Sequence, residues 1–409
     1  MNNTGALAGV RVLDMTRVVA GPYAGQILGD LGAEVVKIER KGEGDDCRRV
    51  GPPWMDNELG REGQDSTYYQ SVNRNKRSIA VDFATEAGAE LIRKLVANAD
   101  VLVENYRTGT LARYGLGYEQ LRAINPRLIY CSVTGFGQTG PYAGRSGYDY
   151  LVQAMAGLMS VTGHHDGEPG DGPMRVGVPI ADICAGLYAA ISVLAALNHR
   201  HASGEGQYID VSLFDSQLAA MLNTFSGWFN GATALGRTGN DHPSAAPYGV
   251  FPVDDGYILI ATFNDREFIR LAGVLGHPEW PGDKRFCSMG ARVANREALK
   301  GLVTEALKGK GKAEWVEVLN AGQVSCGGIN EMADLEKDPQ VLARELIISQ
   351  QHPSNGTIRS AASPMRFSAS PVSYRQAPPL LGEHNEEVLS SWLGLDAGQI
   401  RALQETGAI

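Results

Sequence analysis

The sequence has few cysteines, and no two of them stand at the spacing of a metal or redox site. Its five cysteines are scattered along 409 residues and include no C-x-x-C. An odd, scattered set argues against a disulfide framework and against a zinc site of the common kind. The sequence therefore indicates a reducing compartment, and we expect a cytoplasmic location.

Positive charge is also scarce. Lys and Arg number 37 against 46 Asp and Glu, which leaves a net charge of −9. Proteins that bind nucleic acid favour a basic surface, so we expect no nucleic-acid partner. A local cluster of arginines is still compatible with an anionic small ligand.

Long apolar runs are missing as well. The longest, residues 183–197, is shorter than the ~20 residues of a membrane span and contains Gly186, Tyr188 and Ser192. It predicts a buried helix of a soluble protein. No basic stretch followed by an apolar core opens the chain, so we expect neither a secretory signal nor a membrane partner.

Several signatures of catalysis are absent too. The first predicted strand-to-helix turn, "DMTRVVAGPYAG", lacks G-x-G-x-x-G, the sequence contains no Walker A or G-x-S-x-G pattern, and its eight histidines form no H-E-x-x-H pair. These absences argue against dinucleotide enzymes, NTPases, serine hydrolases and metal hydrolases. We expect no metal and no permanently bound cofactor.

What the first half contains is an alternation of strand and helix patterns. Apolar segments at 10–16, 33–40, 77–83, 100–106 and 127–133 predict strands, and helical patterns separate them. This alternation predicts the α/β class, with a Rossmann-like parallel sheet whose ligands bind at the carboxyl ends of the strands.

The pattern changes near residue 222. We place a large Rossmann-like domain at 1–222 and a smaller α+β domain at 223–337, where "YGVFPVDDGYILIAT" predicts two strands and a turn. A C-terminal segment, 338–409, is expected to return to the large domain.

Polar residues follow several predicted strands. Arg40 and Lys41 come after the second strand, where a cationic pair suits a ribose phosphate, although an ordinary solvated cluster explains it as well. Asn105 and Tyr106 come after the fourth strand, where the asparagine is either a helix cap or a ligand contact.

Asp182 is the one carboxylate in the otherwise apolar stretch "VGVPIADICAGLYAAISVLAAL". An aspartate before a helix commonly caps it. A carboxylate at a helix N-terminus also stays ionised and is then available as a nucleophile. We expect Asp182 to fill both roles, and Asp149 to cap the helix that it begins.

The chain resembles the family III CoA-transferases over nearly its whole length. The resemblance rests on an ordered set of segments that includes "VRVLDMTRVVAGPYAGQILGDLGAEVVKIER", "NRNKRSIAVDF", "VLVENYRTG", "GVPIADICAGLYAAISVLAAL" and "SGEGQYIDVSLFD". Within that family, "RKGEGDDCRRVGPPW" and "STYYQSVNRNKRSIAVDF" are similar to the dicarboxylate enzymes, such as the succinyl-CoA:glutarate CoA-transferases.

The resemblance implies a reaction and its residues. CoA moves from an acyl-CoA, here succinyl-CoA, to a small carboxylic acid such as glutarate, through mixed-anhydride and aspartyl-CoA intermediates on Asp182. It implies an interlocked homodimer and support of the site by Asp149. It also implies CoA contacts at Val18, Ala20, Arg40, Val81, Asn105, Tyr106, Arg113 and Arg145.

Some positions depart from the formyl-CoA:oxalate branch of the family. Val19 stands where that branch has a glutamine, Ala84 stands where it has a lysine, and its glycine-rich lid has no counterpart near "HPSAAPYGVF". An oxalate enzyme is therefore an alternative that these residues do not favour. A second carboxylate on the substrate requires an arginine, and Arg17 and Arg175 are our candidates.

Two further alternatives are a racemase and a regulator. The α-methylacyl-CoA racemase branch has a Gly-His-Asp segment where this chain has Gly147, Tyr148 and Asp149. Tyrosine, with a reference pKa of about 10, is a poor base at neutral pH. A CoA-binding regulator without turnover would not need an ionisable residue at position 182.

Overall fold

The computed structural model describes residues 5–55, 66–231 and 236–409, which belong to two compact units. The first unit combines Met1–Gly157, Val176–Leu222 and Ala343–Ile409, and the second combines Leu158–Arg175 and Asn223–Leu342. The first unit is therefore assembled from three stretches of chain. Its limits differ from those based on the sequence, because residues 158–175 fall in the second unit and the chain returns at residue 343.

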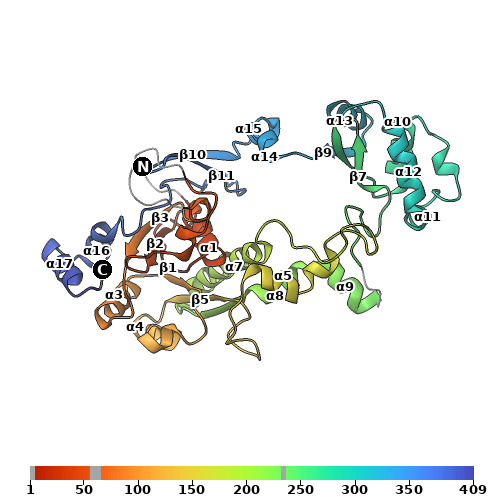
Figure 1. Ribbon diagram of the computed structural model, residues 1–409. Helices are drawn as coiled ribbons and strands as arrows, with labels where there is room; N and C mark the ends of the chain where they lie inside the picture. The colour runs from red at the N-terminus through yellow and green to blue at the C-terminus, as the bar shows by residue number, and fades with distance from the viewer. Residues whose placement is uncertain (1–4, 56–65, 232–235) are drawn as a thin grey trace. The chain divides into compact units, whose positions relative to one another are not determined.

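Within the described residues, the first unit is built on a six-stranded parallel sheet with the order β3-β2-β1-β4-β5-β6 (Figure 1). The strands are β1 (Arg11–Met15), β2 (Glu34–Glu39), β3 (Lys76–Ala80), β4 (Val101–Glu104), β5 (Ile129–Thr134) and β6 (Tyr208–Ser212). The predicted α/β class with a parallel sheet is confirmed. The sequence pattern did not predict β6, because Tyr208 and Asp210 are exposed and interrupt its apolar run.

Successive residues of each strand enter different cores on the two faces of the sheet. Val12 and Val35 pack on the face covered by α1 and α7, whereas Leu13 and Val36 pack on the opposite face. Helices of this unit are α1 (Ala20–Asp30), α2 (Thr67–Ser71), α3 (Glu86–Val96), α4 (Tyr118–Ile124), α5 (Asp149–Met155), α7 (Ile180–Ser203), α8 (Leu213–Ala220), α16 (Asn385–Leu393) and α17 (Ala397–Glu405).

Helix α7 carries the long apolar run of the sequence. By length and composition it is apolar enough to cross a membrane, but in this unit one of its faces packs on the sheet through Ala185, Ala189 and Val193. Its opposite face leaves Leu187 and Ile191 exposed. The predicted burial therefore holds for one face of the helix and is wrong for the other.

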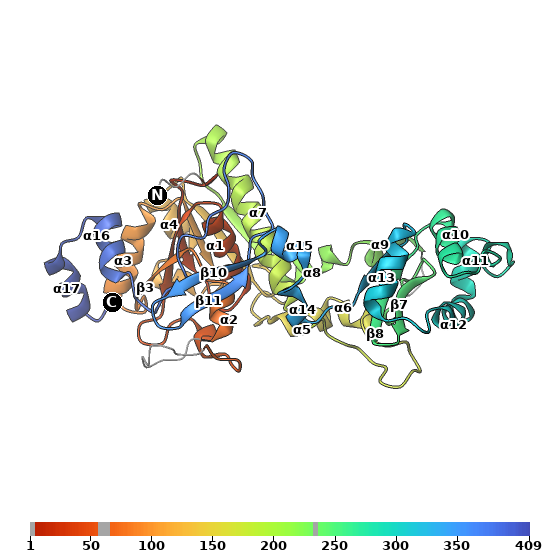
Figure 2. The ribbon, with the colours of Figure 1, turned by 90° about the horizontal axis from the view of Figure 1, so that it is seen from above.

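The C-terminal stretch completes the first unit. The hairpin of β10 (Ile347–His352) and β11 (Gly356–Ala361) is followed by α16 and α17, and Figure 2 shows α16 beside α3. The Asp82 N–H, just after β3, donates to the Ala408 carbonyl at 2.8 Å. The end of the chain thus contacts the sheet close to the carboxyl end of β3.

The second unit contains, in its described part, a three-stranded antiparallel sheet of β7 (Tyr248–Val253), β8 (Gly256–Ala261) and β9 (Ser325–Gly328). The first two strands and their turn match the predicted hairpin. Phe251, Ile258 and Phe268 lie in its core. Helices outside the first unit, or at its borders, are α6 (Leu158–Val161), α9 (Leu222–Gly231), α10 (Asp265–Val274), α11 (Met289–Ala294), α12 (Arg296–Ala306), α13 (Lys312–Ala321), α14 (Met332–Leu335) and α15 (Pro339–Ala343).

Candidate active site

The loop from β1 to α1 lies at the carboxyl edge of the sheet, next to the point where the strand order reverses between β1 and β4. Val18 in this loop has a φ of +71°, a conformation that a β-branched residue rarely adopts. Its N–H donates to Asp45 Oδ1 at 3.0 Å. Asn105, at the end of β4, receives the Arg17 N–H and donates to the Arg17 carbonyl, at 2.9 and 2.7 Å. The asparagine therefore fixes the loop and does not cap a helix.

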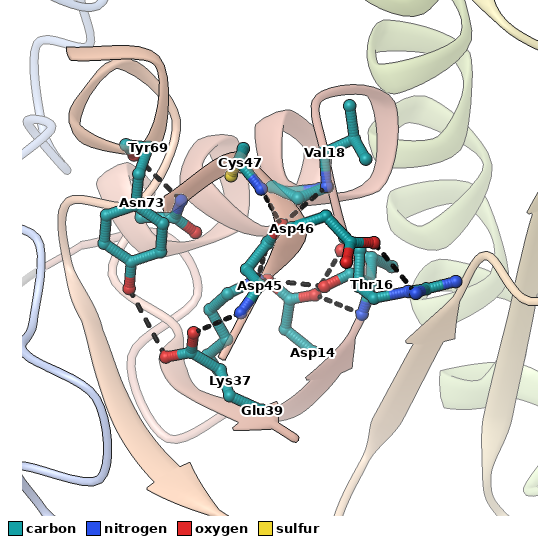
Figure 3. A network of polar contacts seen from close by, with 12 residues as sticks. Asp14, Thr16, Val18, Lys37, Glu39, Asp45, Asp46, Cys47, Tyr69 and Asn73 are labelled. Atoms are coloured by element: carbon teal, nitrogen blue, oxygen red, sulfur yellow. Dashed lines mark hydrogen bonds and ion pairs between the residues drawn. The ribbon is translucent and has the colours of Figure 1, made fainter. Parts of the chain in front are cut away.

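A buried network of charges lies beneath this loop (Figure 3). Lys37, fully buried, contacts Asp45 Oδ2 at 2.8 Å and donates to the Thr16 carbonyl at 2.9 Å. Burial opposes ionisation of Asp45, but Lys37 outweighs it and lowers the pKa of Asp45 to about 2. Opposite charges that satisfy one another in this way hold the loop backbone in a defined position.

A second buried pair supports the same loop. Lys76 contacts Asp14 Oδ2 at 2.8 Å, and Asp14 Oδ1 accepts the Thr16 N–H at 2.9 Å. Burial lowers the pKa of Lys76 to about 8, although Asp14 opposes that shift. The Thr16 N–H is thus held by Asp14 of the strand that precedes it, and the Thr16 carbonyl is held by Lys37 of the neighbouring strand β2.

Asp182 is the third residue of α7, because the helix begins at Ile180. The cap of this helix comes from Asp149, whose Oδ1 accepts the N–H groups of Ala181 and Asp182 at 2.8 and 3.4 Å. The predicted cap role of Asp182 is therefore wrong, and so is the expectation that Asp149 caps its own helix. Among the described residues, the Asp182 carboxyl takes part in no hydrogen bond.

The proton affinity of Asp182 also differs from the expectation. Burial, reinforced by the negative charge of Asp149, raises the pKa of Asp182 to about 7. The predicted effect of the helix N-terminus is smaller than the cost of removing the carboxylate from water. At neutral pH the residue is therefore present both as acid and as carboxylate.

Asp182 faces a hollow of about 300 Å³ whose described lining belongs entirely to the first unit. The hollow gathers many of the residues singled out in the sequence: Arg17, Val18, Val19, Ala20, Asn105, Tyr106, Arg145, Tyr148, Asp149 and Asp182. These residues come from the ends of β1 and β4, from the segment after β5 and from the first turn of α7. The carboxyl edge of the sheet thus brings together the expected binding residues and the expected nucleophile.

A second hollow, of about 510 Å³, is lined by Arg40, Lys41 and Val81. Arg17, Tyr106 and Arg107 line both hollows, so the two are neighbours on the same edge of the sheet. The Arg17 guanidinium lies over the Tyr106 ring at 4.8 Å and contacts Asp46 at 2.9 Å. Cationic side chains at this edge suit a long ligand that carries phosphate groups.

The structure leaves two predicted site residues outside these hollows. Arg113 is exposed and donates to Thr110 Oγ1 at 3.4 Å, and it lines neither hollow. Arg175 is exposed and belongs to the second unit. The binding roles assigned to both remain predictions.

Other residues of the site were missed in the sequence. Arg107 follows Asn105 and Tyr106 directly, so its position after a strand was a signal that we did not use. Tyr68, on α2, is partly buried, and burial together with the charges of Asp182 and Asp149 raises the pKa of its phenol. Its interaction with the charges of Asp182 and Asp149 joins segments far apart in the chain, which no sequence pattern could indicate.

Known proteins share this chain's sequence and fold. Residues 7–385 match the family model described as CoA-transferase family III. A succinate–glutarate CoA-transferase of Agrobacterium fabrum is 43% identical over 390 residues, which are 95% of this chain and 96% of the relative. The succinyl-CoA:glutarate CoA-transferase of Homo sapiens is 40% identical and covers 100% of this chain and 91% of its own length.

Solved structures agree with this relationship. A CaiB/BaiF family protein from Brucella suis matches with a TM-score of 0.85 and 43% identity, over 95% of this chain and 100% of that one. The protein Rv3272 from Mycobacterium tuberculosis matches with a TM-score of 0.81 and 32% identity, over 94% and 99%. The chain therefore belongs to CoA-transferase family III and is an acyl-CoA:carboxylate CoA-transferase.

Proposed function

We propose that this enzyme transfers CoA from succinyl-CoA to a dicarboxylate such as glutarate, with Asp182 as the nucleophile. The observation that carries the proposal is the carboxyl of Asp182, which is free of the helix cap and faces a hollow that adjoins a cationic one. The names of the relatives from Agrobacterium fabrum and Homo sapiens support succinyl-CoA and glutarate as the substrates.

The reaction has four steps in which one activated acyl group replaces another. The Asp182 carboxylate attacks the succinyl thioester carbonyl and expels CoA thiolate, which leaves a succinyl–aspartyl anhydride. The thiolate attacks the aspartyl carbonyl, releases succinate and forms an aspartyl-CoA thioester. The glutarate carboxylate then attacks this thioester, and the thiolate that it releases attacks the glutaryl carbonyl of the new anhydride. Glutaryl-CoA leaves and the Asp182 carboxylate is restored.

The residues around Asp182 have separate roles in this scheme. Arg40 and Lys41 provide positive charge for the CoA phosphates, and the fixed loop at Val18 lies beside the reacting carboxyl. Tyr68, whose phenol interacts with the charges of Asp182 and Asp149, is the proposed O–H donor for the negative charge that develops on the attacked carbonyl oxygens. Arg17, a sequence candidate, lines the hollow together with Arg107 and Arg145, and these three are the proposed partners of the second carboxylate. Arg175 remains a candidate from the sequence alone.

The racemase alternative needs a base at Tyr148 or Asp149. The Tyr148 side chain is 68% exposed, and both Asp149 oxygens already accept N–H groups. Neither residue is arranged to remove an α-proton, so these contacts favour the transferase.

We extend the proposal to a cytoplasmic homodimer. The exposed apolar side chains of α7, Leu187 and Ile191, support a partner surface, and the free cysteines of the described chain suit a reducing compartment. The dimer is tested by light scattering across a range of protein concentrations. A mass equal to one chain at all of them contradicts it.

The nucleophile is tested by trapping. The enzyme is treated with succinyl-CoA and hydroxylamine, and the modified residue is mapped by mass spectrometry. We expect the adduct on Asp182 and no turnover by Asp182→Asn. Asp215 is the matched control because it is also the third residue of a helix, α8, but is exposed. Asp215→Asn should keep its activity, and an adduct elsewhere or an active Asp182→Asn contradicts the proposal.

The acceptor is tested with a panel of acids at fixed succinyl-CoA. Glutarate should exceed its monocarboxylate analogue butyrate by at least about tenfold in kcat/KM, because an arginine pairs with the second carboxylate. Equal rates for the two acids contradict the dicarboxylate assignment and leave the Asp182 chemistry intact.

A further inference from the structure

Gln153 lies behind the two carboxyls of the site, and its side chain is wholly buried. It is four residues after Asp149 on α5, so both side chains lie on the same side of that helix. Its Nε2 donates to Asp149 Oδ2 at 2.7 Å, and its Oε1 accepts the Val176 N–H at 2.9 Å. One amide therefore joins Asp149 to the segment that leads into α7.

The orientation of this amide is determined by its partners. The Val176 N–H is a donor and must face the amide oxygen, so the NH₂ group is left facing Asp149 and the Val178 carbonyl, at 2.7 and 3.5 Å. Rotating the amide by half a turn would place two donors together at Val176 and two acceptors together at Asp149. Gln153 therefore presents a donor to Asp149 at all times.

The donors around Asp149 fix the position of its carboxyl. In the part of the chain that the structure describes, Asp149 Oδ2 accepts a hydrogen bond from the Gln153 amide, and Oδ1 accepts the backbone N–H groups of Ala181 and Asp182. Every one of these partners donates, so together they hold the Asp149 carboxyl in one place. They fix its negative charge next to the Asp182 carboxyl, for which the described residues supply no such donor.

We propose that Gln153 is a positioning residue of the transferase, which holds the Asp149 carboxyl against the N–H groups of Ala181 and Asp182 and thereby fixes its negative charge beside the Asp182 carboxyl. The inference rests on the proposed role of Asp182 as nucleophile. Gln153 has no contact with the hollow and acts through Asp149. The same amide also anchors residues 176–178, so the first turn of α7 starts from a fixed point.

Other charged or titratable groups also surround Asp182. Tyr68 on α2 interacts with its charge, Cys184 lies two residues further along α7, and the hollow that Asp182 faces is lined by Arg17, Asp46, Tyr106, Arg107, Arg145, Tyr148 and Asp149. Among them, Asp149 is the one that the described contacts join to Gln153. A change at Gln153 should therefore reach Asp182 through Asp149.

The experiment measures kcat/KM for succinyl-CoA against pH, whose acidic limb reports ionisation in the free enzyme. Gln153→Met removes the donor and keeps the length of the side chain. The Asp149 carboxyl then loses its fixed place, its charge acts less strongly on Asp182, and Asp182 is ionised at lower pH. We expect the midpoint of the acidic limb to move about half a pH unit lower, so that kcat/KM at pH 6 rises about threefold relative to its plateau.

The double variant separates positioning from simple structural damage. Asp149→Asn alone should move the limb further down, because it removes the neighbouring charge. Gln153→Met should add no further shift in the Asp149→Asn background, since the carboxylate through which it acts is gone. Gln217→Met is the control, because Gln217 is also buried and lies on α8, a neighbour of α7. It should leave the limb in place.

A loss of rate in Gln153→Met without a shift of the limb overturns the inference, and so does an equal shift in both backgrounds. If Gln153→Met does not fold, Gln153→Glu keeps an oxygen for Val176 and adds a carboxyl beside Asp149. That variant should move the midpoint of the acidic limb to higher pH, and an unchanged midpoint contradicts the inference. If the trapping experiment labels Asp182 but the acidic limb of Gln153→Met does not move, only the role of Gln153 is contradicted. If the label is on another residue, the proposed function itself is contradicted.

Discussion

The side chain of Asp149 accepts the backbone N–H of Ala181 at 2.8 Å and so caps a helix that begins 31 residues later in the chain. Asp182 lies in the first turn of that helix, at the end where peptide dipoles favour negative charge. The cap function is supplied from α5, so the carboxyl of Asp182 remains available for chemistry. The same arrangement places a second negative charge close to the nucleophile.

The first prediction concerns the pH dependence of the native enzyme. The pKa of Asp182 is raised to about 7, and the attack requires its ionised form. The value of kcat/KM should therefore be half-maximal near pH 7 and should fall about tenfold for each unit below it. Initial rates with succinyl-CoA in buffers of constant ionic strength provide the measurement. A plateau that extends down to pH 5 would show that the carboxyl ionises as an ordinary aspartate.

The second prediction concerns stability. A carboxyl whose pKa is raised on folding destabilises the folded state as pH rises above its unfolded pKa of about 4, and the effect becomes constant above the folded pKa of about 7. Asp182→Asn should therefore raise the thermal midpoint by a few degrees at pH 8, and by much less near pH 4. Scanning calorimetry at several pH values tests this. A gain that is the same at every pH would point to packing instead of charge.

The third prediction compares two adjacent aspartates. Asp45 is buried against Lys37, whereas Asp46 pairs with Arg17 and its side chain is 57% exposed. Asp45→Asn should lower the free energy of unfolding by about 3 kcal/mol, because it leaves a buried lysine without its partner. Asp46→Asn should change it by less than about 1 kcal/mol. Urea titrations followed by circular dichroism measure both, and similar values for the two variants would contradict the assigned burial.

The fourth prediction concerns Tyr68. Tyr68→Phe removes the O–H of a phenol whose pKa is raised by burial and by the charges of Asp182 and Asp149, and it keeps the ring. We expect kcat to fall about tenfold, because the developing negative charge loses a donor. Tyr257→Phe, an exposed tyrosine of the second unit, is the control and should not alter kcat. An unaffected Tyr68→Phe would remove the phenol from the mechanism.

The sheet could be predicted because its strands are local apolar runs. The segments around Val12, Val35 and Val101 are continuous in sequence and need no distant partner to be recognised. The edge strand β6 and the short strand β9 carry too few buried residues for the same signal. Lys37 and Lys76 gave no sign of being buried, because the carboxylates that neutralise them come from other strands and loops.

The site was predictable where it follows the topology of the sheet. Asn105, Arg40 and the β1–α1 loop come after neighbouring strands, and parallel strands bring their carboxyl ends to one edge. The cap of α7 was not predictable, since it depends on how α5 packs beside that helix. Gln153 and Tyr68 were missed for the same reason, as their roles come from contacts between distant segments.

The order in which the chain leaves the ribosome bears on how the first unit matures. Its sheet is encoded before residue 213, but the Asp82 N–H meets the carbonyl of Ala408, the penultimate residue. Domains tend to fold as they emerge, yet this unit lacks that contact until the second unit and the stretch from residue 343 to residue 408 have been synthesised. The first unit can therefore complete its folding only after the second unit has left the ribosome.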